Sequence, residues 1–142
     1  MIFGDGEQTR DFTFVTNVVE ANLLACHAPT ELAVGAVFNI GCGAATSIRD
    51  LWKEIAGLVG VDLEPLHEPA RTGDVRHSLA SITRAREQLG YNPTVSLQEG
   101  LLQTIAYYRD RVATDRTERE RMRAAPVSAT QRLVRANLYP AA

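Results

Sequence analysis

The chain has 142 residues and a formal net charge of −2 at pH 7, with 45% hydrophobic and 23% charged residues. This is the composition of a globular protein and not of a disordered one, and the length suits one domain with a modest core. The acidic balance argues against a general nucleic-acid binder. No apolar run approaches the roughly 20 residues that cross a bilayer, so no membrane partner is expected.

The amino end, MIFGDGEQTR, lacks both the basic start and the long apolar stretch of a signal peptide, so a cytoplasmic protein is expected. The two cysteines, Cys26 and Cys42, make neither a disulfide framework nor a zinc site. The three histidines, His27, His67 and His77, lack ligand spacing. We therefore expect no metal site.

The first elements lie within the amino-terminal 28 residues. Residues 1–10 have the glycines and aspartate of a loop. The alternation in DFTFV predicts a short strand over residues 11–15. Thr16 is a candidate cap for a helix that runs to about Ala28.

A strand, a turn and a helix are predicted next. The apolar run AVFNIG predicts a strand over residues 36–41 that enters a glycine turn. Ser47 and Asp50 have the spacing of a capping box, and Gly60 suits the end of the helix that they begin. A strand that leads through a glycine turn into a helix is typical of an α/β protein.

Shorter elements follow. Residues 61–69 suit an extended segment broken by prolines, and residues 71–78 suit a loop. A short helix is predicted over residues 81–89, and Ser96 and Glu99 form a second capping box at the start of another helix.

The character of the chain changes after residue 108. Ten of the fifteen residues from 109 to 123 are charged, which favours a solvated helical extension, with a partner-binding helix as the alternative. Residues 124–142 contain two prolines and are expected to form a flexible tail. The predicted organisation is therefore a region over 1–108, this extension and the tail.

Two loops combine arginine, aspartate and glycine: GDGEQTRDF at 4–12, which contains Arg10, and RTGDVRHS at 71–78, which contains Arg71 and Asp74. The planar guanidinium group matches phosphate oxygens two at a time and stays charged at any relevant pH. Glycines let backbone N–H groups approach the same oxygens. An aspartate in such a loop can accept a hydrogen bond from a sugar hydroxyl. Two such loops could grip a diphosphate from two sides.

The same residues allow a plainer interpretation. Arg10 with Asp11, and Arg71 with Asp74, could be ion pairs that only stabilise their own loops. Arg76 lies close to Asp74 in sequence and is a candidate for a secondary phosphate contact. The chemistry of the residues alone leaves both interpretations open.

Three segments in register resemble one family. GDGEQTRDFTFVTNVVEANLLAC, VFNIGCG and RTGDVRHSLASITRAREQLGYNPTVSLQEGL resemble the carboxy-terminal part of the NAD-dependent sugar epimerases and dehydratases, the extended short-chain dehydrogenases. Within that family they are most similar to UDP-glucose and UDP-N-acetylglucosamine 4-epimerases. The resemblance covers about residues 2–108.

The resemblance implies roles for matching positions. Arg10, in the TRDF motif, would contact the diphosphate of a nucleotide sugar. Arg71 and Asp74, in the RxGD motif, would contact the diphosphate and the nucleotide ribose. Residues 37–41 would form a strand of the main sheet.

The catalytic parts of that family have no match in this chain. There is no glycine-rich dinucleotide fingerprint, and GCGAATS at 41–47 is a poor substitute. The family's catalytic tyrosine and lysine stand four residues apart, but the one lysine here, Lys53, has Arg49 at that position. NAD is therefore expected in full-length relatives and not on this chain alone, and no catalytic residue is assigned.

These observations give one expectation for fold and several for function. The expected fold is α/β, an incomplete carboxy-terminal part of a Rossmann-type enzyme with a small substrate-binding subdomain. The expected function is the UDP-sugar-binding portion of a 4-epimerase that is inactive alone, although dehydratases and decarboxylases share the scaffold. The alternatives are a non-catalytic interaction module, half of a split enzyme whose partner carries the Rossmann half, or a nonfunctional gene fragment.

Overall fold

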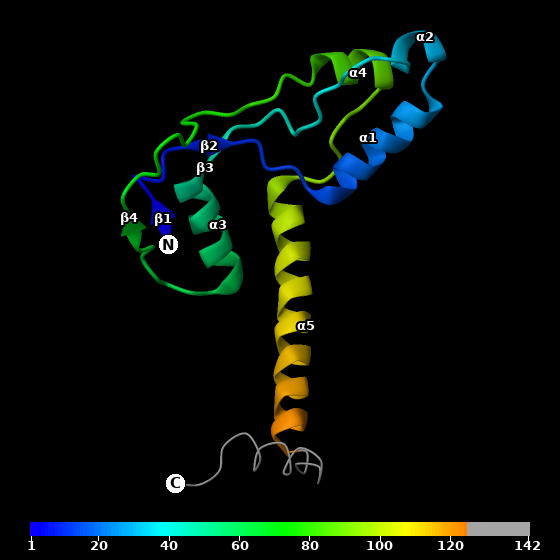
Figure 1. Ribbon diagram of the computed structural model, residues 1–142. Helices are drawn as coiled ribbons and strands as arrows, with labels where there is room; N and C mark the ends of the chain where they lie inside the picture. The colour runs from blue at the N-terminus through cyan, green and yellow to red at the C-terminus, as the bar shows by residue number, and fades with distance from the viewer. Residues whose placement is uncertain (125–142) are drawn as a thin grey trace, which may run out of the picture. The chain divides into compact units, whose positions relative to one another are not determined.

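The computed structural model describes residues 1–124, with side chains through residue 117. Its elements, in order, are β1 (Ile2–Phe3), β2 (Thr9–Arg10), α1 (Val15–His27), α2 (Thr30–Ala33), β3 (Thr46–Ser47), α3 (Ile48–Val59), β4 (His67–Glu68), α4 (Thr83–Leu89) and α5 (Leu97–Ala124) (Figure 1). A first unit, Met1–Ile105, and a second unit that begins at Ala106 are described separately. All but the first residue of the predicted tail, 124–142, lies outside the described residues.

Two small sheets bring distant segments together in the first unit. Strand β1 pairs in parallel with β4, with Ile2 opposite His67. Strand β2 pairs antiparallel with β3, with Arg10 opposite Thr46. A single parallel bridge joins Thr9 to His77. The two loops that contain Arg10 and Arg71 are thus joined through their backbones.

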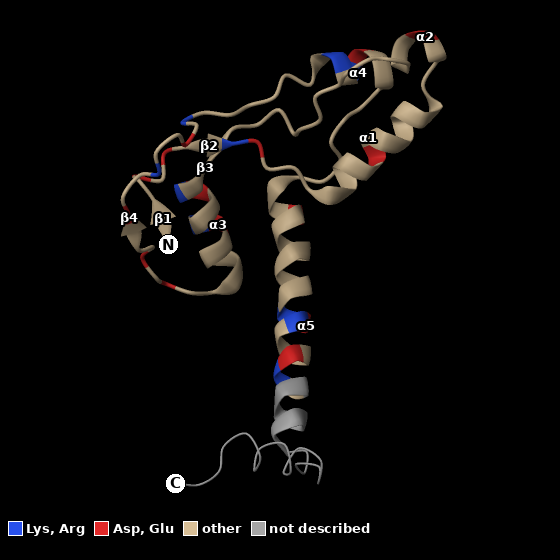
Figure 2. Cartoon of the chain, in the orientation of Figure 1, with Lys and Arg blue, Asp and Glu red and all other residues tan. Residues whose placement is uncertain are grey.

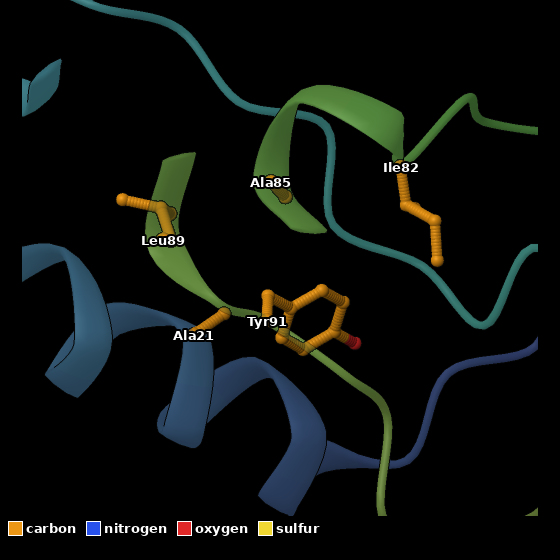
Figure 3. Close-up of a cluster of buried hydrophobic side chains, with 5 residues drawn as sticks. All are labelled: Ala21, Ile82, Ala85, Leu89 and Tyr91. Carbon is orange, nitrogen blue, oxygen red and sulfur yellow. The ribbon is translucent and has the colours of Figure 1, made fainter. Parts of the chain in front are cut away.

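The core of the first unit lies where α1 meets α4 (Figure 3). The buried hydrophobic side chains of this cluster are Ala21, Ile82, Ala85, Leu89 and Tyr91. The Tyr91 hydroxyl donates a hydrogen bond to the Gly41 carbonyl oxygen at 2.9 Å, so its polar end is satisfied. Burial raises the pKa of Tyr91 above its ordinary value.

A buried asparagine connects α1 to the segment before α5. Asn17 has no exposed surface. Its Oδ1 accepts hydrogen bonds from the backbone N–H groups of Thr94 at 3.1 Å and Val95 at 3.0 Å, and its Nδ2 donates to the Val95 carbonyl oxygen at 2.8 Å. A buried amide is tolerated because both of its ends are satisfied in this way.

Several sequence predictions are confirmed. Ser47 caps α3 and accepts from the Asp50 N–H at 3.0 Å, and Gly60 ends that helix with φ +78°. Ser96 and Glu99 form the second capping box, with Ser96 N–H donating to Glu99 Oε2 at 2.9 Å. Glu99 accepts these bonds as a carboxylate, so they lower its pKa.

Two predicted strands are wrong, as is the predicted helix cap. Residues 11–14 are not a strand because the β2–β3 ladder ends at Arg10, and Asp11 then binds backbone N–H groups with its side chain. Helix α1 begins at Val15 after Phe14, which makes no side-chain cap, so Thr16 lies inside the helix. Residues 36–41 are not a strand because no described segment forms a ladder with them.

Candidate functional site

Backbone contacts of one residue, Thr9, fix the separation of the two arginine loops. Its N–H donates to the Arg76 carbonyl oxygen at 2.9 Å, and its own carbonyl oxygen accepts from the Ser78 N–H at 3.1 Å. Its hydroxyl lies 3.1 Å from His77 Nδ1. Arg10, the next residue in the chain, therefore lies beside the 71–78 loop.

The first predicted pair of site residues is in direct contact. Arg10 Nη2 lies 2.6 Å from Asp74 Oδ1, although 64 positions separate the two residues in sequence. Arg10 Nη1 donates to the Thr9 carbonyl oxygen at 2.8 Å. The side chains remain 28% and 37% exposed, so both can still be reached from solvent.

The third predicted site residue, Arg71, is held by an aromatic ring. Its guanidinium carbon lies 3.7 Å from the centre of the Phe3 ring in β1, which is the geometry of a cation–π contact. The Asp74 N–H donates to the Arg71 carbonyl oxygen at 3.2 Å, and Gly73 takes φ +82° in this turn. Among the described residues, no side-chain hydrogen bond of Arg71 is found, so its N–H donors remain available.

The candidate secondary residue, Arg76, is paired with Asp5. Its two terminal nitrogens lie 2.8 and 2.9 Å from the two carboxylate oxygens. The hydrogen bonds from Arg76 lower the pKa of Asp5 from 3.8 to about 2. Figure 2 shows basic and acidic positions close together on the segments around β1, β2 and the start of α3.

Sequence reasoning missed the partners of the predicted residues. The alternative interpretation places ion pairs within each loop, whereas the pairs found among the described residues join the two loops: Arg10 with Asp74 and Arg76 with Asp5. The contact of Arg71 with Phe3 was also missed. An ion pair between residues that are close in sequence can be recognised from the sequence. A pair between residues more than 60 positions apart leaves no such pattern.

The glycine turn before α3 does not fit a dinucleotide. A pyrophosphate needs free backbone N–H groups at such a turn. Here the N–H groups of Cys42 and Gly43 donate to the Asp11 carboxylate at 2.9 and 3.0 Å. The position that a phosphate would take is therefore filled by a negative charge.

Further features of the described residues concern a pocket, a metal site and a membrane span. A mainly apolar pocket of about 200 Å³ is lined by residues 12–14, Leu51, Ile55 and the start of α5. Within the described residues, no group of three or more His, Cys, Asp or Glu side chains is placed to hold a metal ion. The described helices include none that is long and apolar enough to cross a membrane.

Comparison with known proteins gives consistent matches. The model of the family described as GDP-mannose 4,6 dehydratase matches residues 1–104. UDP-glucose 4-epimerase of Mycolicibacterium smegmatis is 46% identical over 110 residues, which cover 78% of this chain and 34% of that protein. The crystal structure of UDP-glucose 4-epimerase with UDP-glucose from Thermotoga maritima superposes with a TM-score of 0.72 at 46% identity, over 78% of this chain and 35% of that one.

One similar structure contains both a nucleotide sugar and NAD. UDP-glucuronic acid 4-epimerase from Bacillus cereus, solved in complex with UDP-glucuronic acid and NAD, superposes with a TM-score of 0.66 at 34% identity, over 70% of this chain and 32% of that one. The match to Rossmann-type epimerases confirms the α/β fold class. The chain spans about a third of the length of the relatives that it matches.

Proposed function

Because this chain belongs to the family of NAD-dependent sugar epimerases and dehydratases, we propose that its first unit binds the nucleotide diphosphate of a UDP-sugar. The observation that carries the proposal is the contact between the two arginine loops. Arg10 and Asp74 meet at 2.6 Å, and Arg71 is held on Phe3 in the same unit. Two guanidinium groups are thus ordered before any ligand arrives.

The chemistry of this arrangement suits a diphosphate. An ordered guanidinium group loses less side-chain entropy on binding than a free one, and its fork matches phosphate oxygens. Arg71 has the larger number of uncommitted donors, because Arg10 already donates to Thr9 and Asp74. We therefore assign the stronger phosphate contact to Arg71 and a supporting contact to Arg10.

Asp74 is assigned to the ribose. Its Oδ1 accepts from Arg10, while its Oδ2 has no hydrogen-bond partner among the described residues. A carboxylate oxygen that is uncommitted and half exposed can accept from a sugar hydroxyl. The pair with Arg10 would keep the Asp74 carboxylate oriented for that purpose. Arg76 is the weaker candidate for a phosphate contact, because Asp5 already takes both of its terminal nitrogens.

We propose that this chain alone does not catalyse epimerisation. Hydride transfer in the family depends on NAD and on a tyrosine–lysine pair, and neither the fingerprint nor the pair occurs in this sequence. The glycine turn before α3 is filled by Asp11 and offers no alternative site for NAD. The remaining chemistry would come from the parts of the full-length enzyme that this chain does not match.

A second candidate function is an interaction module that pairs with a separate protein carrying the Rossmann half. Two observations favour it. The first is a stripe on α1 formed by Val15, Val19 and Leu23, which are 64%, 51% and 57% exposed. The extended segment 36–41 also has no ladder partner among the described residues, and its Val37 is exposed. A partner polypeptide could cover both surfaces, by pairing a strand with segment 36–41 and by packing an apolar face on the α1 stripe.

Thermal melts of the purified chain test the first proposal. A ligand that binds only the folded state at ten times its Kd stabilises that state by about 1.4 kcal/mol, which raises the midpoint by several degrees in a domain of this size. We expect UDP-glucose and UDP-N-acetylglucosamine to raise the midpoint, and Arg71→Ala to abolish the shift. Arg10→Ala should reduce it.

The matched control is Arg86→Ala, which removes one exposed arginine from α4. This control should keep the full ligand-induced shift. A midpoint that no UDP-sugar moves, in a chain that melts cooperatively, would contradict the proposal and favour the interaction module. Detection of NAD-dependent epimerisation by the pure chain would contradict the assignment of catalysis to other parts.

A further inference from the structure

The carboxylate of Asp11 forms a clamp between β2 and the turn before β3. Its Oδ1 accepts from the Cys42 N–H at 2.9 Å, and its Oδ2 accepts from the Gly43 N–H at 3.0 Å. One carboxylate thereby satisfies two successive backbone donors. Such charge-assisted bonds are shorter and stronger than neutral ones, so the clamp is a stiff connection.

Gly41 provides the space for this clamp. It is buried, and a Cβ atom built at this position would collide with Asp11 Oδ2. The Gly41 carbonyl oxygen also accepts the hydrogen bond from the buried Tyr91 hydroxyl. The turn that Asp11 grips is therefore attached to the core and is not a free loop.

The clamp lies directly after Arg10 in the chain. On the other side of Arg10, Thr9 is fixed by the Arg76 and Ser78 backbones. Arg10 itself is paired with Thr46 in β3. Its backbone is therefore held on both sides, while its side chain extends to Asp74.

We infer that Asp11 is a positioning residue for Arg10 in nucleotide-diphosphate binding. This inference rests on the proposed function. Asp11 does not touch the ligand in this account, since both of its carboxylate oxygens are used by Cys42 and Gly43. It acts by fixing the direction from which the Arg10 guanidinium reaches the phosphate.

A purely structural role is the competing explanation, and binding measurements separate the two. If Asp11 acts through Arg10, its replacement weakens UDP binding only when Arg10 is present. If Asp11 merely stabilises the fold, its replacement has the same effect on UDP affinity in both backgrounds. A double-mutant cycle of Asp11→Asn and Arg10→Ala on the Kd for UDP measures this difference directly.

The test uses the full chain and UDP as the probe, with ¹H–¹⁵N correlation spectra as the readout. The spectra report folding, the amide signals of Cys42 and Gly43, and UDP affinity in one experiment. We expect low-field amide protons at both residues, which shift upfield in Asp11→Asn. UDP affinity should fall by up to about 10-fold in that variant, and by no more than in Arg10→Ala, because Asp11 acts only through Arg10.

The double variant should bind UDP no more weakly than Arg10→Ala alone. Asp62→Asn is the matched control, because it removes an exposed aspartate outside the site, and it should bind as the unaltered chain does. Gly41→Ala is the second variant: it displaces the carboxylate without changing any charge and should weaken UDP binding to a similar extent.

Different results would overturn the positioning role of Asp11 and the proposed binding of the nucleotide diphosphate. Unchanged UDP affinity in a folded Asp11→Asn chain, or an equal loss with and without Arg10, would overturn the positioning role alone. Amide signals of Cys42 and Gly43 at ordinary positions in the unaltered chain would also overturn it, even if both variants fail to fold. Failure of the unaltered chain to bind UDP while those signals are at low field would overturn the proposed function, and the positioning role with it.

Discussion

At the scale of single residues, the Asp5 carboxylate occupies both terminal nitrogens of Arg76. Both terminal nitrogens of Arg76 lie within 2.9 Å of the Asp5 oxygens. The bond is exposed, with side-chain exposures of 55% and 50%, so water and salt screen much of its strength. Its clearest signature is the pKa of Asp5, which the hydrogen bonds from Arg76 lower to about 2.

This pair predicts a specific titration. Because the folded-state pKa of Asp5 is depressed, the stability contributed by the pair is present above about pH 4 and is lost as the pH falls toward 2. We expect Arg76→Ala to return the titration midpoint of the Asp5 carboxyl carbon, followed by NMR, toward 3.8. The pKa of Glu99, which Ser96 lowers, should not respond to this change. An Asp5 midpoint near 3.8 in the unaltered chain would contradict the pairing.

The residues of the candidate site could be chosen from the sequence, but their partners could not. Arginines in glycine loops have a recognisable chemistry, and the family motifs assign roles to Arg10, Arg71 and Asp74. The pairing of Arg10 with Asp74 depends on a single bridge between Thr9 and His77, which no local pattern encodes. An ion pair of Asp11 with Arg10 is one interpretation of the sequence, whereas in the structure the Asp11 carboxylate accepts from the backbone N–H groups of residues 42 and 43.

At the scale of elements, the capping boxes of α3 and α5 were predictable, whereas the start of α1 and the strands were not. Capping depends on residues three positions apart, so Ser47 with Asp50 and Ser96 with Glu99 could be read directly. A strand requires a hydrogen-bonded neighbour, which sequence alternation does not supply. Residues 36–41 have the composition of a strand but no ladder partner among the described residues.

Close packing at the start of α5 predicts a destabilising substitution. A Cβ atom at Gly100 would lie 2.9 Å from Phe14 Cδ2 and 3.1 Å from Phe14 Cγ. Alanine in place of a helical glycine gains up to about 1 kcal/mol in propensity. Overpacking costs about 1–3 kcal/mol, so we expect Gly100→Ala to be destabilising or, where Phe14 yields fully, neutral. Denaturant unfolding of the chain measures the difference.

The chain offers a matched control for this substitution. Gly57 lies within α3 and has no heavy atom within 4 Å of the position that a Cβ would occupy. Gly57→Ala should therefore show the propensity gain alone and raise the free energy of unfolding by up to about 1 kcal/mol. If Gly100→Ala stabilised the chain as much as Gly57→Ala, the close contact with Phe14 would be disproved.

At the scale of the whole molecule, the chain matches about a third of the length of its relatives. The apolar stripe on α1 and segment 36–41, which forms no strand ladder with any described segment, are surfaces of the kind that a larger sheet would cover. Exposure of such a surface favours self-association of the isolated chain. Arg10, Arg71 and Asp74 lie on other segments of the first unit, and Gly41, at the end of segment 36–41, adjoins Asp11.

We propose that Arg10 and Arg71 bind the diphosphate of the nucleotide. This proposal is tested most directly by calorimetric titration of the chain with UDP and, in parallel, with uridine. We expect UDP to bind more tightly than uridine, by about tenfold or more for each charge-assisted contact of 1.5–3 kcal/mol. Arg71→Ala should remove most of this difference while the chain remains folded. Equal affinities for UDP and uridine, or a difference that persists in folded Arg71→Ala, would show that the arginines do not bind the diphosphate.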